Sequence, residues 1–240
     1  IGGILVSLPL VLRFVHDRPS SHPRVGAELA TTLEHAAGSI DVEDRPTWRL
    51  LLARPFQILM LGGIISNAIA LGIASWLPTY LASLDGVDYR DLSFLAAAPY
   101  AASLLGLAMW ATIGDKTNRR AMTISVGYFG AGVLATGAFM AGSAQIVWLT
   151  VTLLSLAVFC VSAWTASEFA IVQRIVPRAH VANGVGLYNG LTTMIGGGLG
   201  PFIVGGIIDG GAGTRDLITI FALCTTISVL MIAFSRRVAY

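Results

Sequence analysis

Residues 92–120 read LSFLAAAPYAASLLGLAMWATIGDKTNRR, an apolar run that ends abruptly in a short basic loop. An α-helix rises ~1.5 Å per residue, so about 20 apolar residues suffice to cross ~30 Å of hydrocarbon. The chain contains six such runs, at 55–84, 92–113, 121–142, 145–172, 181–208 and 217–234. The sequence therefore predicts an all-α integral membrane protein.

The overall composition agrees with this prediction. Hydrophobic residues make up 55% of the chain, charged residues 12%, and the mean hydropathy is +0.76, which together exclude an ordinary soluble domain. The net charge of +2 does not indicate nucleic acid, since the cations lie at membrane borders, where they meet lipid headgroups. No metal-ligand spacing, catalytic triad or phosphate-binding loop occurs, so we expect neither a metal, a cofactor nor an enzyme.

The basic residues are distributed unevenly across the loops. If the segment before residue 55 is cytoplasmic, thirteen of the 15 lysines and arginines lie on the cytoplasmic side, and only Arg90 and Arg215 lie outside. This is the positive-inside bias of multi-pass membrane proteins. It predicts a protein of the cell membrane whose polar segment 13–54 and C-terminus are cytoplasmic.

Three segments follow from this pattern. Residues 1–12 are apolar but too short to span, which favours the tail of a preceding membrane helix. Residues 13–54 form a cytoplasmic connector, with either a short interfacial helix near 47–53 or a loosely ordered linker. Residues 55–240 form the six-span bundle, which divides into two inverted three-helix repeats.

The fifth run is rich in glycine. Gly186 with Gly190, and Gly196 with Gly200, have the four-residue spacing that allows another helix to approach closely. Pro201 removes a backbone donor, so we expect a kink there. Two interpretations are open: a bendable helix that lines a moving pathway, or static close packing.

The loop 114–120, GDKTNRR, resembles the cytoplasmic loop motif of the major facilitator superfamily, Gly-x-x-x-Asp-Arg-x-Gly-Arg-Arg. The pattern is degenerate, since Ala111, Lys116 and Asn118 replace expected residues. In that family the motif stabilises the state closed to the cytoplasm. The resemblance implies that Asp115 lies against the N-terminus of the fifth span, while Arg119 or Arg120 reaches an acid on a neighbouring helix. A plain positive-inside loop is the alternative.

Further stretches resemble the C-terminal half of the anion:cation symporter branch of this superfamily. They are WLPTYL at 76–81, APY at 98–100, GVGLYN at 184–189 and DRP at 17–19. The resemblance covers about residues 55–209 and implies symport of a small organic anion with H⁺ or Na⁺. It also implies a fragment of a twelve-helix protein whose N-terminal six-helix bundle is the missing partner.

Glu168 lies well within an apolar run, which makes it a functional candidate. Three interpretations compete: pairing with Arg119 or Arg120, binding of substrate or a coupling proton, or marking the helix end.

Other polar residues approach the membrane midplane, where transporter sites lie. Asn189 matches the substrate-facing asparagine of the resembled family, and Asn67 either binds substrate or bonds to another helix. Ser162, Trp164 and Ser167 are further substrate candidates, although Trp164 has helix packing as its alternative. Trp76 and Tyr80 lie nearer the outside and form either an outer gate or an interfacial belt.

A carboxylate buried in the membrane needs a cation, yet no lysine or arginine occurs deep in these spans. We therefore expect the anion-binding arginine in the N-terminal half. The function predicted is alternating-access symport of a small organic anion. The alternatives are a drug or metabolite efflux antiporter of the same superfamily and a non-transporting membrane subunit or sensor.

Overall fold

The computed structural model describes residues 26, 28–29, 31–32, 47–209 and 214–237. The chain divides into two compact units, Ile1–Arg45 and Pro46–Tyr240. In the first unit, the hydroxyls of Thr31 and Thr32 donate to the carbonyl oxygen of Glu28, at 2.9 and 2.8 Å, within a helical turn. The expected membrane tail 1–12 and most of the connector lie outside the described residues.

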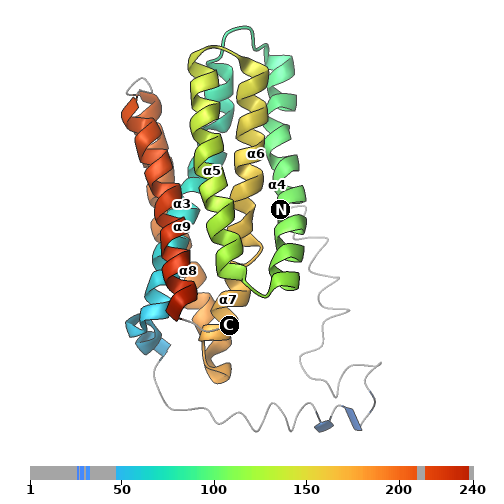
Figure 1. The fold of residues 1–240 in the computed structure, drawn as a ribbon, viewed down its shortest axis with the longest axis vertical. Helices are drawn as coiled ribbons and strands as arrows, with labels where there is room; N and C mark the ends of the chain where they lie inside the picture. Colours follow the sequence, from blue (N-terminus) through green and yellow to red (C-terminus); the bar gives the residue numbers. More distant parts are fainter. Residues whose placement is uncertain (1–25, 27, 30, 33–46, 210–213, 238–240) are drawn as a thin grey trace, which may run out of the picture. The chain divides into compact units, whose positions relative to one another are not determined.

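The second unit is helical throughout its described residues (Figure 1). Its long helices are α3 (Arg54–Ala82), α4 (Tyr89–Thr117), α5 (Arg120–Ser143), α6 (Val147–Thr165), α8 (Val181–Asp209) and α9 (Thr214–Arg237). The shorter elements are the 3₁₀-helices η2 (Thr47–Leu52) and η3 (Arg178–His180) and the helix α7 (Glu168–Ile175). The short helix expected at the end of the connector is thus present as η2.

Five stretches of the described chain are long and apolar enough to cross a membrane. They are Arg54–Ala82, Arg90–Thr117, Arg120–Ser143, Val147–Ile175 and Ile218–Arg237. Helix α8, which is 29 residues long, is not among them. The predicted all-α, multi-pass membrane fold is confirmed.

The fourth apolar run is one candidate span, but its helix is interrupted near one end. It forms α6 and α7, which are separated by a two-residue turn at Ala166 and Ser167. In this turn the backbone N–H of Ser167 donates to the carbonyl oxygen of Trp164 at 2.8 Å, a shorter-range bond than the α-helical ladder makes. The turn lies at the same end of the bundle as the α4–α5 loop (Figure 1).

The helices pack as two related sets of three. Contacts are most extensive between α3 and α8, α5 and α6, α5 and α9, and α4 and α6. We match α3 with α6, α4 with α8 and α5 with α9. Under this matching, the contact between α3 and α8 corresponds to the contact between α6 and α4. In the same way, the contact between α5 and α6 corresponds to the contact between α9 and α3. This exchange is the pattern that two three-helix repeats predict.

Glycines make the closest of these helix contacts. A side chain at Gly196 or Gly200 of α8 would collide with the backbone carbonyl oxygens of Ile64 and Ala68 on α3. Gly106 of α4 lies in the same way against the backbone of α6. The Gly196–Gly200 pair therefore serves static close packing, as one interpretation of the sequence predicts. Gly190, in the other predicted pair, faces no atom within 4 Å among the described residues.

Candidate functional site

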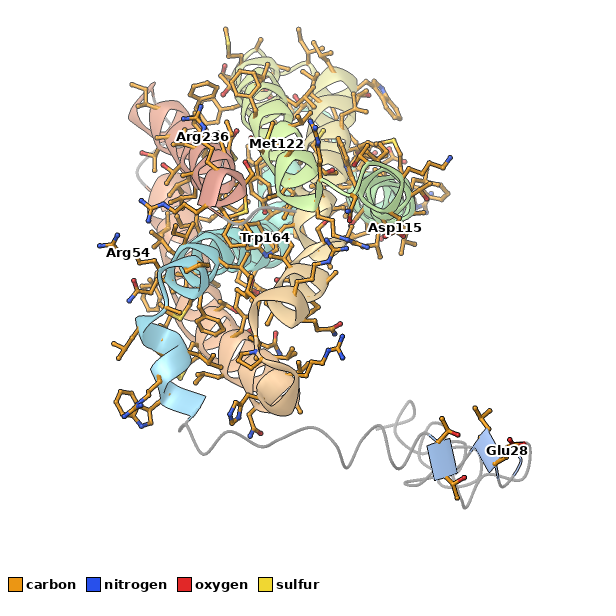
Figure 2. All side chains as sticks on the ribbon, turned by 60° about the horizontal axis from the view of Figure 1, so that its bottom comes forward. Glu28, Arg54, Asp115, Met122, Trp164 and Arg236 are labelled. Carbon is orange, nitrogen blue, oxygen red and sulfur yellow. The ribbon has the colours of Figure 1, made fainter. Side chains whose placement is uncertain are left out.

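The carboxylate of Glu168 lies inside the bundle, at the turn between α6 and α7. The residue is 9% exposed. Its Oε2 atom accepts two hydrogen bonds, one from the indole N–H of Trp164 at 2.7 Å and one from the hydroxyl of Tyr188 at 3.0 Å. Because these donors belong to α6 and α8, one carboxylate oxygen joins α6, α7 and α8. Figure 2 shows Trp164 in the interior of the bundle.

Two further polar side chains extend this arrangement to α3 and α5. The ring of Tyr128 meets that of Trp164 edge to face, with centroids 6.1 Å apart and an interplanar angle of 79°. The hydroxyl oxygens of Tyr128 and Ser66 lie 2.6 Å apart, within hydrogen-bonding distance. We call Ser66, Tyr128, Trp164, Glu168 and Tyr188 the Glu168 cluster. It connects every long helix of the bundle except α4 and α9.

Two glycines of α3 make room for the large side chains of the cluster. A methyl group at Gly62 would lie 2.5 Å from the Cη2 atom of Trp164, and one at Gly63 would lie 2.5 Å from the hydroxyl oxygen of Tyr188. Interiors are close-packed, so any side chain at these positions displaces an aromatic ring. The pair Gly62 and Gly63 therefore positions the donors that bind Glu168.

The cluster binds a carboxylate with neutral donors. Burial removes the carboxylate from solvating groups, and the two donors that replace them, an indole and a phenol, carry no charge. Hydrogen bonds to a charged group contribute about 1.5–3 kcal/mol each, and losing one leaves the buried group short of a partner. The arrangement thus holds the end of α6 and α7 against α8 through bonds that are costly to break.

The loop 114–120 docks beside this cluster. The guanidinium of Arg120 forms a salt bridge with Asp115, and its Nη1 donates to the carbonyl oxygen of Ala166 at 3.3 Å. Arg174 of α7 donates to Oδ1 of Asn118 at 2.9 Å. Asn118 ends α4 in the left-handed region, with φ of 52°, where asparagine is one of the better-tolerated residues. Two arginines therefore fasten the α4–α5 loop to the α6–α7 segment.

A sequence model of the Major Facilitator Superfamily matches residues 1–201 and, in a second alignment, residues 85–238. The chain belongs to this superfamily. It is 28% identical over 134 residues to a quinolone resistance transporter of Acinetobacter baumannii, an alignment that covers 56% of this chain and 30% of the relative. It is also 28% identical over 150 residues to a hexuronate transporter of Bacillus subtilis (strain 168), covering 60% of this chain and 35% of the relative. The chain thus spans about a third of the length of these two relatives.

The charge pairs that the loop 114–120 makes in the structure differ in detail from those that the sequence predicted. Asp115 binds Arg120 of its own loop, whereas the sequence predicted the N-terminus of α8 as its partner. Arg120 is occupied by Asp115 and the Ala166 carbonyl, and Glu168 by Trp164 and Tyr188, so the structure describes no pairing of Glu168 with Arg120. Arg119 is exposed at the start of α5. The turn at 166–167 causes the difference, because it directs the Glu168 side chain into the bundle.

The two asparagines among the substrate candidates have different surroundings. Asn67 donates to the carbonyl oxygen of Gly63 in its own helix at 3.0 Å, and its Cβ lies beside Gly196 at the α3–α8 contact. Asn189 is exposed on α8, and its Oδ1 accepts a long hydrogen bond of 3.4 Å from Thr193. In the described part of the chain, these two asparagine side chains do not hydrogen-bond each other.

The remaining three substrate candidates are buried. The Oγ atom of Ser162 lies 3.0 Å from that of Ser103 on α4, so this serine joins two helices. Trp164 belongs to the Glu168 cluster. Ser167 is 1% exposed, and its Oγ has no hydrogen-bond partner among the described residues. A buried hydroxyl without a partner costs about 1–3 kcal/mol, which makes the α6–α7 turn a locally unfavourable element.

The two proposed gate residues also have defined partners. The indole N–H of Trp76 donates to the carbonyl oxygen of Pro201 on α8 at 2.8 Å. The hydroxyl of Tyr80 lies against Gly142 near the end of α5. Helix α8 continues unbroken through Pro201. Both aromatic residues therefore join helices at the end of the bundle remote from Asp115.

Sequence reasoning assigned no role to Tyr188, Tyr128 or Ser66. Each lies in an apolar run, and polar groups of this kind are common in membrane helices. The adjacent glycines 62 and 63 were the available signal, since small residues mark places where helices or large rings approach.

Proposed function

We propose that this chain forms the C-terminal half of a transporter of the anion:cation symporter branch, which moves a small organic anion with H⁺ or Na⁺. The observation that carries the proposal is the likeness to the hexuronate transporter, joined to a superfamily match over most of the chain. A hexuronate is a small carboxylate, the class of substrate that the sequence predicts.

The placement of polar groups on α8 supports a substrate path along that helix. Asn189 is exposed, and a methyl group at Gly186 or Gly190 beside it would meet no atom of another described element within 4 Å. This surface has room for a ligand and offers amide donors. Every described lysine and arginine lies at or near a helix end, so we place the cation that binds the carboxylate in the N-terminal six-helix bundle.

The contacts at the basic end of the bundle support motion as a rigid body. The Glu168 cluster joins α3, α5, α6, α7 and α8, and Arg120 connects the α4–α5 loop to the same turn. We propose that the bundle rocks as one unit against its partner during alternating access. The basic end faces the cytoplasm of a cell whose plasma membrane contains the transporter.

Uptake of labelled carboxylates by the full-length parent in proteoliposomes tests the proposal. The panel includes a hexuronate, and separate experiments impose an inward proton or sodium gradient. We expect one acid to be concentrated and the matching ionophore to abolish its uptake. Absence of uptake under both gradients, from protein shown to be folded, contradicts the proposal.

The second candidate is an efflux antiporter, which the equal identity to the quinolone resistance transporter favours. Inverted vesicles to which a fluoroquinolone is added from outside distinguish the two functions. Gradient-driven accumulation of the drug without carboxylate transport indicates efflux.

A further inference from the structure

An apolar cavity lies in the half of the bundle remote from Asp115. Its volume is about 180 Å³, and its walls come from α3, α5, α6, α8 and α9. The wall contributed by α3 runs along one face from Ala68, at the middle of the helix, to Tyr80, near its end at Ala82. Two small residues of α5, Ala135 and Ala138, leave space that larger side chains would fill.

The residues of α3 that line the cavity follow the direction in which lipid chains run. At ~1.5 Å per residue, the stretch from Ala68 to Tyr80 covers about 18 Å parallel to the helix axis. One leaflet contributes about 15 Å of the ~30 Å hydrocarbon layer. The lining residues of α3 therefore extend over about the depth of one leaflet, from the middle of the helix toward the end that carries the α3–α4 loop.

The walls also have the chemistry of a hydrocarbon site. They are almost wholly apolar, and the N–H of Trp76 is already donated to the Pro201 carbonyl, so its ring is what the wall presents. An apolar cavity of about 150 Å³ stays dry and accepts apolar ligands in other proteins. Hydrocarbon is the medium around membrane-spanning helices, so acyl chains are at very high local concentration here.

We propose that this cavity holds part of one acyl chain of a bilayer lipid, which enters from the leaflet at that end of the bundle. The chain packs between the two three-helix sets, because α3 and α5 belong to one set and α6, α8 and α9 to the other. The lipid therefore packs between the two three-helix sets at one end of the bundle, whereas Glu168 and its partners join the two sets at the opposite end. The proposal is independent of the transported substrate.

Quenching of Trp76 fluorescence by brominated lipid tests this site. The full-length parent is reconstituted in vesicles of phosphatidylcholine that carries bromine at the middle of its acyl chains, and in vesicles of the unbrominated lipid. The emission of Trp76 is obtained as the difference between the parent and Trp76→Phe. Trp148, which is 77% exposed, is the reference residue in contact with bulk lipid, and its emission is obtained by the same kind of difference measurement. We expect the emission of both residues to be quenched.

Variants that fill the cavity distinguish an acyl chain bound inside it from lipid that contacts only the outer surface of the bundle. Two variants enlarge residues that line the cavity: Ala138→Leu and, with a smaller added side chain, Ala135→Val. The matched control is Val133→Leu, which enlarges a half-exposed residue of the same helix. We expect the two filling variants to abolish quenching at Trp76 but not at Trp148, and Val133→Leu to change neither. Unquenched Trp76 in the parent overturns the proposal, and so does undiminished quenching in either filling variant that keeps the parental unfolding temperature.

Discussion

Replacing Gly63 by alanine should destabilise the bundle by displacing Tyr188 from Glu168. The new methyl group would lie 2.5 Å from the hydroxyl oxygen of Tyr188 and 2.8 Å from the Cγ2 atom of Thr192, distances too short for either neighbour to stay in place. Tyr188 is 0% exposed, so its ring has no free space into which to move. The hydroxyl must therefore shift, and its 3.0 Å hydrogen bond to Glu168 is lengthened or lost.

The magnitude follows from three contributions. Overpacking a close-packed site costs about 1–3 kcal/mol, and losing a hydrogen bond to a charged group costs about 1.5–3 kcal/mol. Replacing glycine by alanine inside a helix raises the free energy of unfolding by about 1 kcal/mol, which offsets part of this loss. The net loss is about 1.5–5 kcal/mol, which corresponds to a fall on the order of 10 °C in unfolding temperature for a chain of this size.

Thermal unfolding of the purified protein in detergent measures this effect. The matched control is Gly130→Ala, where the methyl group meets the sulfur of Cys160 at an ordinary 3.5 Å, and its unfolding temperature should be unchanged or slightly higher. A double-mutant cycle adds Tyr188→Phe, which removes the nearest atom of the collision. In that background Gly63→Ala should cost at least about 1 kcal/mol less than in the parent. Fully additive costs would refute the proposed link between Gly63 and the Tyr188 hydroxyl.

Three further predictions concern the loop, the substrate face and the remote end of the bundle. Asp115→Asn removes the charge that holds Arg120 beside the Ala166 carbonyl, so the resting protein should shift toward the inside-open state; unchanged labelling of inside-facing cysteine probes would contradict this. Asn189→Ala should raise the half-saturation constant for transport without loss of folded protein, and an unaltered constant would place the substrate elsewhere. Trp76→Phe should lower stability by about 0.5–1.5 kcal/mol, because it removes one hydrogen bond to the Pro201 carbonyl; equal unfolding temperatures for variant and parent would argue against that bond.

The sequence located much of the candidate site but not its connections. Glu168 was identified because an ionisable residue in an apolar run is costly, which is a local property. The alternatives for its partner could not be decided, since they depend on which way the side chain points after the turn at Ala166 and Ser167. In the structure the partners are Trp164, four residues away along the chain, and Tyr188, 20 residues away. The loop residues Asp115 and Arg120 were likewise selected as candidates, while their pairing with each other and the hydrogen bond from Arg120 to Ala166 were not foreseen.

The sequence by itself determined that the chain is a helical, multi-pass membrane protein, and it placed the spans to within a few residues. Hydropathy and charge act through each segment's own transfer between water and hydrocarbon, so they can be read one segment at a time. Only the tertiary structure decided the break between α6 and α7, the hydrogen bonds of Glu168 and the apolar cavity. Those features depend on contacts such as that of Ser66 with Tyr128, 62 residues apart, and on which glycines face a neighbouring ring. No single segment of the chain contains that information.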